Sequence, residues 1–113
     1  VAVGEVVGDV DGRVCLLVDD MIDTAGTICG AARVLKDHGA DKVICAATHP
    51  ILSGPAIERL NESDFEEVIV TNTLPVADVD AIPKMTVLSI APLIAKAIQE
   101  VFTDGSVTSL LSH

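Results

Sequence analysis

Short continuous apolar runs punctuate the chain, and segments of mixed polarity separate them. The runs read VCLLVD, VICAAT, EVIVTN and MTVLSI, and they occupy residues 14–19, 43–48, 67–72 and 85–90. A continuous apolar run of this length is typical of a strand that is buried on both faces of a sheet. The sequence therefore predicts four buried strands.

Helices are predicted between and after these strands. Behind the first run, apolar residues recur at helical spacing and a glycine stands where a helix should end, at Ile28, Ala31, Ala32, Leu35 and Gly39. Pro55 opens a short second helix and Pro92 a further one, because proline is favoured in the first helical turn. Asp11-Gly12 is a hairpin signal that predicts a short edge ribbon at the start.

This alternation of strands and helices predicts right-handed crossovers. The expected fold is α/β, three-layered, with a doubly wound and mostly parallel sheet. We expect a single domain over residues 1–113 that forms part of a larger domain.

Composition narrows the range of partners. Half of the 113 residues are hydrophobic, yet only Phe65 and Phe102 are aromatic, so aliphatic residues must build the core. There are 17 acidic residues against 7 Lys and Arg, a formal charge of −10. This charge argues against nucleic acid or an anionic membrane as a partner. A small phosphorylated ligand remains compatible with it, because backbone N–H groups bind phosphate without basic side chains.

The three cysteines, Cys15, Cys29 and Cys45, lie far apart in apolar surroundings without a CxxC pair. This spacing supports neither a zinc site nor a disulfide framework, and it favours free buried thiols in a reducing compartment. No signal peptide and no apolar run long enough to span a bilayer is visible. We therefore expect a cytoplasmic location.

The stretch LLVDDMIDTAGT, residues 16–27, carries the candidate chemistry. It runs from the carboxyl end of a predicted strand into a helix N-terminus, whose unpaired N–H groups and partial positive charge attract anions. Gly26 lets the backbone approach a ligand closely, and Thr24 and Thr27 add hydroxyl donors. Ligands of parallel sheets bind beyond the carboxyl ends of the strands. Three predicted loops end at that edge, namely residues 19–27, 48–54 and 71–75.

Asp19 and Asp20 would repel a phosphate, so we expect them to face another part of the ligand. Vicinal sugar hydroxyls fit, because carboxylates accept O–H hydrogen bonds strongly, and a magnesium ion is an alternative. The chain has neither the GK[ST] of a P-loop nor a GxGxxG motif, which argues against a Walker-type nucleotide site. The combination favours a sugar phosphate. The structural alternative is that Asp23 or Thr24 only caps the helix while the paired acids are solvated.

LLVDD also resembles the first strand of a response-regulator receiver domain, in which paired acids bind magnesium. Such a receiver needs an acceptor Asp at the end of its third strand. Here that strand ends in VTNT, without an Asp. The receiver interpretation fails at this point.

VDDMIDTAGT resembles the phosphoribosyl pyrophosphate loop of the type I phosphoribosyltransferase fold, in the version found in ribose-phosphate pyrophosphokinases. Further matches follow in the family's order and cover nearly the whole chain, namely VVGDVDGR, ATHPILSGPA, VTNTLP, VLSIAPLIAKAI and GSVTSLL. The resemblance implies a kinase of nucleotide biosynthesis that moves a pyrophosphoryl group from ATP to the 1-hydroxyl of ribose 5-phosphate, giving phosphoribosyl pyrophosphate, with magnesium. It also implies homo-oligomers in which dimers assemble into hexamers.

Carried over by motif, the resemblance implies that the 5-phosphate is held by Asp23, Thr24, Ala25, Gly26 and Thr27. It implies that Asp19 and Asp20 face the ribose 2- and 3-hydroxyls. His49 stands in THP where the family more often has THG, and we expect it to make a structural hydrogen bond.

The tail GSVTSLL resembles the segment that lines the family's regulatory site, where phosphate activates and ADP inhibits. Ser106 and Thr108 would be its hydroxyl donors, and Leu111 stands where the family often has Phe. The structural alternative is a C-terminal tail with incidental hydroxyls.

The family's ATP-binding residues, its metal-binding His and Asp, and its loop with catalytic Lys and Arg all precede VVGDV. The resemblance therefore implies no catalytic residue and no metal ligand set within these 113 residues, and no synthetase activity of this chain alone. Two alternatives stay open. One is a phosphoribosyltransferase that joins a base to the same sugar, although SGPA, VTNT and GSVTSL are not its usual company. The other is a non-catalytic, synthetase-like regulatory subunit, in which such loops are typically degraded.

Overall fold

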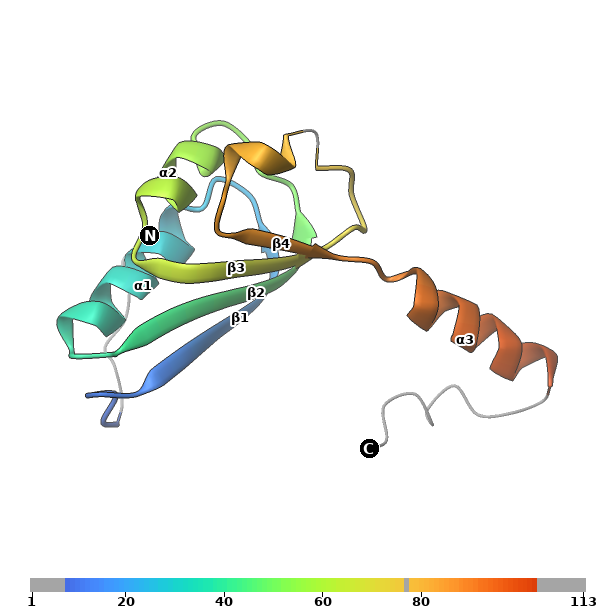
Figure 1. The fold of residues 1–113 in the computed structure, drawn as a ribbon, viewed down its shortest axis with the longest axis horizontal. Coiled ribbons are helices and arrows are strands. Elements are labelled where there is room, and N and C mark those ends of the chain that lie inside the picture. Colours follow the sequence, from blue (N-terminus) through green and yellow to red (C-terminus); the bar gives the residue numbers. More distant parts are fainter. Residues whose placement is uncertain (1–7, 77, 104–113) are drawn as a thin grey trace.

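Four parallel strands form one sheet in the sequential order β1-β2-β3-β4 (Figure 1). The structure is a computed structural model that describes residues 8–76 and 78–103. In chain order its elements are β1 (Val14–Ile22), α1 (Gly26–Asp37), β2 (Lys42–Pro50), α2 (Ala56–Glu62), β3 (Phe65–Thr71), the 3-10 helix η1 (Val79–Ala81), β4 (Met85–Leu88) and α3 (Ala91–Phe102). The predicted α/β fold with a parallel sheet is confirmed. Of these elements, only η1 has no counterpart in the apolar pattern.

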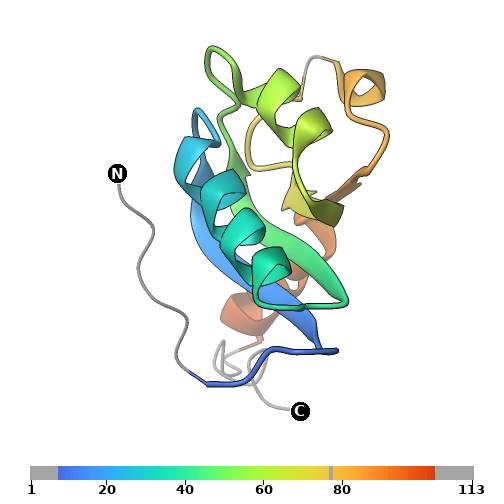
Figure 2. The same ribbon diagram turned by 90° about the vertical axis from the view of Figure 1, so that its left-hand side faces the viewer.

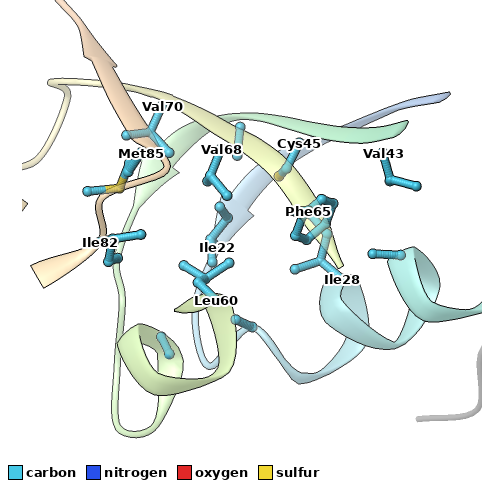
Figure 3. Close-up of a cluster of buried hydrophobic side chains, with 14 of the residues drawn as sticks. Ile22, Ile28, Val43, Cys45, Leu60, Phe65, Val68, Val70, Ile82 and Met85 are labelled. Carbon is cyan, nitrogen blue, oxygen red and sulfur yellow. The ribbon is translucent and has the colours of Figure 1, made fainter. Parts of the chain in front are cut away.

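Both α1 and α2 cover the same face of the sheet. Strands that are added in one direction through right-handed crossovers require this arrangement, and Figure 2 shows the two helices stacked in front of the strands. The core lies between these helices and the sheet (Figure 3), and its largest fully buried side chains are Ile22, Leu60, Ile82, Val43, Val68, Val70 and Cys45. Because each such aliphatic side chain contributes about 1.5–3 kcal/mol on burial, this interface dominates the stability of the described residues.

In the described part of the chain, β1 is covered on one face only. The side chains of Val14, Leu16 and Val18 are 60%, 59% and 75% exposed, whereas the alternating Cys15 and Leu17 pack against the core. The apolar run predicts burial on both faces. The structure differs because the sequential strand order places both crossover helices on one side.

The last helix stands apart from the sheet. α3 follows β4 and projects away from the other elements (Figure 1), so its apolar residues Leu93, Ile94 and Ile98 are about half exposed. Just before this helix, Ile90 N–H donates to Asn72 Oδ1, in the loop after β3, at 2.9 Å. The described residues thus form two of the three predicted layers.

Glycine ends α1 as the sequence predicts. Gly39 has a φ of 95°, in the left-handed region that favours glycine, and its N–H donates to Lys36 O at 3.0 Å. The chain then turns directly into β2, so that α1 lies across β1 and β2.

The expected turn at Asp11-Gly12 is present, with Arg13 N–H donating to Val10 O at 3.0 Å. Residues 8–13 contain no strand. The first arm of the predicted ribbon lies largely outside the described residues.

The loops that follow β1, β2 and β3 meet at one edge of the sheet, as predicted. Ser53 N–H donates to Asp23 O at 2.8 Å, which joins the first loop to the second. Thr71 Oγ1 donates to Thr48 O at 2.6 Å, which joins the second strand to the third. This edge therefore brings together the segments in which the sequence predicts a ligand site.

Candidate ligand site

At its carboxyl end, β1 leads into a pocket of about 170 Å³ at the N-terminus of α1. Its lining consists of Asp19, Met21, Ile22, Asp23, Thr24, Ala25, Gly26, Thr27 and Ile28. Every predicted ligand-binding residue except Asp20 is therefore part of one pocket. Asp20 follows Asp19 within β1 but does not line the pocket.

The N-terminus of α1 lacks the usual side-chain cap. Its N-cap residue is Ala25, which is 5% exposed, has a φ of 67° and makes no side-chain capping hydrogen bond. Ser, Thr, Asp or Asn at this position would accept a hydrogen bond from a first-turn N–H group, and alanine has no oxygen with which to do so. The first α-helical bond is the one from Cys29 N–H to Ala25 O, at 3.0 Å. The structural alternative, in which Asp23 or Thr24 caps this helix, is not what the described residues show.

The loop before α1 is oriented by the segment that follows β2. Leu52 N–H donates to Ile22 O at 3.0 Å, and Ser53 N–H donates to Asp23 O at 2.8 Å. The C=O and N–H groups of one trans peptide unit point in opposite directions. The N–H groups of the next residues, Asp23 and Thr24, therefore point away from that segment, whose residues do not line the pocket. Successive N–H groups on one side of a loop form an anion-binding concavity.

The polar side chains of the pocket are exposed. Among the described residues, the only side-chain hydrogen bond made by Asp19, Asp23, Thr24 or Thr27 joins Asp20 N–H to Asp19 Oδ1, at 2.8 Å. No lysine, arginine or histidine occurs among the described residues that line the pocket. With carboxylates, hydroxyls and backbone N–H groups but no cationic side chain, the pocket is equipped to bind a ligand that carries both hydroxyls and an anionic group.

The described part of the chain contains no set of side chains that could bind a metal ion. No three His, Cys, Asp or Glu side chains lie there in an arrangement that would hold a metal ion. Of the two natural candidates for magnesium, Asp19 lines the pocket and Asp20 does not. By themselves these residues do not fit a resident magnesium site.

The cysteines are free, and Cys45 lies in the core beneath the sheet edge. Burial raises the pKa of the Cys45 thiol to about 12, with smaller contributions from the Cys29 thiol and the Asp19 carboxylate. Burial also raises the pKa of Cys29, and its hydrogen bond with Ser63 partly offsets this effect. Both thiols therefore stay protonated at neutral pH, so neither is poised as a nucleophile.

His49 has the structural role expected from the sequence. Its Nδ1 lies 2.9 Å from Thr73 Oγ1, which ties the end of β2 to the loop after β3. The predicted regulatory residues Ser106 and Thr108, together with Leu111, lie outside the described residues.

The apolar lining of the pocket was not singled out by motif. Met21 and Ile22 are the last two residues of β1, and Ile28 belongs to the buried face of α1. The spacing of Ile28 does predict a core residue, but only the fold shows that the core also forms the floor of the pocket.

Within residues 8–76 and 78–103, no helix is long and apolar enough to span a membrane.

Comparisons with known proteins agree over nearly the whole chain. The family model described as the phosphoribosyl synthetase-associated domain matches residues 3–112. The chain is 64% identical over 113 residues to a ribose-phosphate pyrophosphokinase of Streptomyces coelicolor, covering 100% of this chain and 35% of that protein. It is 57% identical over 105 residues to a ribose-phosphate pyrophosphokinase of Mycobacterium leprae, covering 93% of this chain and 32% of that protein.

A solved structure shows the same likeness in three dimensions. The crystal structure of phosphoribosylpyrophosphate synthetase from Mycobacterium smegmatis superimposes with a TM-score of 0.81 at 57% identity, covering 88% of this chain and 33% of that one. The chain thus spans about a third of the length of the curated relatives it matches.

Proposed function

The chain belongs to the phosphoribosyl synthetase-associated domain family, and from this premise we propose that the pocket at the N-terminus of α1 binds the ribose 5-phosphate of a ribose-phosphate pyrophosphokinase. The uncapped start of α1 carries the proposal. Ala25 supplies no side-chain cap, and the loop before it turns its N–H groups away from the segment that holds its carbonyl oxygens. A phosphate is the anion whose several oxygens match such a set of donors.

The sugar hydroxyls account for the acids in the same pocket. Asp19 lines the pocket from within β1, whereas the N–H groups of residues 23–27 belong to the following loop and the first turn of α1. A carboxylate accepts hydrogen bonds from vicinal hydroxyls, whereas it would repel a phosphate at the same place. In the proposed complex, Asp19 faces the 2- and 3-hydroxyls and the start of α1 holds the 5-phosphate. The neighbouring acid Asp20 does not line the pocket, which predicts a weaker role for it.

In the proposed enzyme a pyrophosphoryl group moves from ATP to the 1-hydroxyl of the bound ribose 5-phosphate. The contribution of this chain is to bind the sugar and to orient its 1-hydroxyl, since fixed geometry lowers the barrier of a transfer reaction. Magnesium and ATP are expected partners of the whole enzyme. We further propose that phosphate and ADP regulate the whole enzyme. We also propose that it assembles into homo-oligomers up to a hexamer and that it is cytoplasmic.

Calorimetry on this chain tests the binding claim. Titration with ribose 5-phosphate should release heat, and titration with ribose should release none, because the phosphate supplies the main contact. Gly26→Val should abolish the heat, since a branched side chain at residue 26 would prevent the close approach of the backbone to the ligand and would also meet the side chain of Arg59. Unchanged binding by Gly26→Val would contradict the assignment of the pocket.

A chimera tests the reaction. In the ribose-phosphate pyrophosphokinase of Streptomyces coelicolor, the matched segment would be replaced by this chain. The chimera should form phosphoribosyl pyrophosphate from ATP and ribose 5-phosphate, and Asp19→Asn within it should lower the turnover. Consumption of phosphoribosyl pyrophosphate that depends on an added base would instead indicate a phosphoribosyltransferase. Altered assembly with unaltered turnover in Asp19→Asn would indicate a regulatory subunit.

A further inference from the structure

The loop of the candidate site is held from behind by a side chain that contributes nothing to the pocket lining. Arg59 Nη1, from α2, donates to Thr24 O at 3.1 Å. This bond follows directly on the two backbone bonds that Leu52 and Ser53 make to the preceding carbonyls. Three consecutive carbonyl oxygens of the loop are therefore occupied, at Ile22, Asp23 and Thr24.

Each of these bonds fixes the direction of the N–H group that belongs to the same peptide unit as the bound carbonyl. The peptide unit that contains Thr24 O also contains the N–H of Ala25, which points the other way. By holding Thr24 O, the guanidinium fixes the direction of the Ala25 N–H. The N–H groups of Asp23, Thr24 and Ala25 therefore point away from the groups that bind the loop's carbonyl oxygens, just before the first turn of α1.

The guanidinium also lies close to the backbone of the helix start. A Cβ atom added to Gly26 would stand 2.9 Å from Arg59 Nη1. Gly26 lines both the ligand pocket and a groove of about 420 Å³ on the other side, which Arg59 also lines. Gly26 is therefore the residue at which the ligand pocket and the groove of Arg59 adjoin.

Backbone strain is concentrated at the same place. Ala25, with a φ of 67°, and Leu52, with a φ of 56°, are the two non-glycine residues with positive φ in the described ranges. One lies in the loop that is held, and the other lies in the segment that holds it. Such conformations persist only where the surrounding structure enforces them, and they cluster at functional sites. The hydrogen bonds from Leu52, Ser53 and Arg59 supply that enforcement.

We propose that Arg59 is a positioning residue for the ribose 5-phosphate loop. Its guanidinium fixes the peptide between Thr24 and Ala25, so that the backbone N–H groups face the phosphate, and it places a positive charge behind them without touching the ligand. This inference rests on the proposed function of the pocket. It adds a determinant of phosphate binding outside the motif, because Arg59 lies 35 residues after Thr24 in the sequence.

Arg33 provides a matched control. It lines the same groove as Arg59, and its side chain is 70% exposed. Its guanidinium forms ion pairs with Asp37 at 3.5 Å and Asp64 at 3.7 Å, and among the described residues it makes no recorded contact with the loop. Removing it changes the charge of the groove by the same amount without releasing Thr24 O.

The test compares Arg59→Met, Arg59→Lys and Arg33→Met by calorimetric titration of this chain with ribose 5-phosphate. Loss of a hydrogen bond from a charged donor predicts about tenfold weaker binding by Arg59→Met, and a change of less than about twofold for Arg33→Met. Arg59→Lys should fall between Arg59→Met and the parent, because a lysine keeps the charge but not the planar fork. Amide resonances of residues 23–27 should move in Arg59→Met and stay in place in Arg33→Met.

The outcomes separate the two proposals. A parent chain that does not bind ribose 5-phosphate would overturn the proposed function, and this inference with it. A parent chain that binds, together with a folded Arg59→Met of equal affinity and unmoved amide resonances, would overturn the inference alone. If Arg59→Met does not fold, Arg59→Lys decides, because equal affinity of that folded variant would overturn the role of the guanidinium.

Discussion

The guanidinium of Arg59 occupies the place where a side chain at Gly26 would begin, with 2.9 Å between Arg59 Nη1 and the position of a Cβ atom. Gly26 does not have a positive φ, so a side chain at residue 26 is limited by the contact with Arg59 and not by backbone conformation. The DTAGT motif and α2 are thus complementary in shape. This relationship links a residue of the predicted ligand loop to one that the motif does not contain.

The first prediction concerns this pair. Gly26→Ala should weaken ribose 5-phosphate binding by about tenfold, because the arginine must leave Thr24 O to make room. The same substitution in an Arg59→Met background should cost much less, since the competing group is absent. A double-mutant cycle of calorimetric affinities measures the difference. Strict additivity of the two changes would contradict the contact.

The paired acids should differ in importance. Asp19 lines the pocket, whereas Asp20 does not. We expect Asp19→Asn to weaken ribose 5-phosphate binding by about tenfold, and Asp20→Asn by less than about threefold, because only the first replaces a charged acceptor of sugar hydroxyls with a neutral amide. Both substitutions keep the size and shape of the parent side chain, so each changes its charge alone. Equal losses of affinity would show that the loop rearranges on binding.

The two faces of the sheet should respond differently to the same substitution. Val68 is 0% exposed beneath the helices, and Val18 is 75% exposed on the open face of β1. Val68→Ala should lower the free energy of unfolding by about 2 kcal/mol through lost packing. Val18→Ala should lower it by less than about 1 kcal/mol, chiefly through strand propensity. Urea denaturation of both variants measures the contrast, and similar losses would indicate that the open face is covered in solution.

The raised pKa of Cys45 predicts a loss of stability in alkaline solution. The thiol ionises near its ordinary value of 9.0 in the unfolded chain and near 12 in the folded chain. The stabilisation is therefore complete below about pH 9 and is lost as the pH rises toward about 12, since the unfolded chain releases its proton first.

Cys45→Ala isolates this contribution from other titrating groups. The free energy of unfolding of the parent should fall more steeply than that of Cys45→Ala between about pH 8 and about pH 10.5. Parallel pH profiles of the two proteins would show that the thiol is not protected by burial.

Much of the fold follows from local patterns. The four apolar runs become β1 to β4, and Gly39 ends α1 where its position predicts. The loops after β1 and β2 meet because a parallel sheet gathers its carboxyl ends at one edge. These features depend on periodicity and chirality, which are properties of short segments.

The rest depends on long-range geometry. The open face of β1 follows from the strand order, which no apolar run encodes. Only one of the paired acids, Asp19, lines the pocket, although the motif treats Asp19 and Asp20 alike. The contact between Arg59 and Thr24 joins residues from different elements. None of these has a local sequence signature, which is why the motif could indicate the candidate site but not the residues that support it.

The most direct test of the account is a titration of the isotopically labelled chain with ribose 5-phosphate, followed through its backbone amide resonances. The account predicts that the resonances of Ala25, Gly26 and Thr27 move to saturation with ribose 5-phosphate and do not move with ribose, because the start of α1 binds the phosphate group. Stationary resonances at these three residues, or equal movement with ribose, would contradict it.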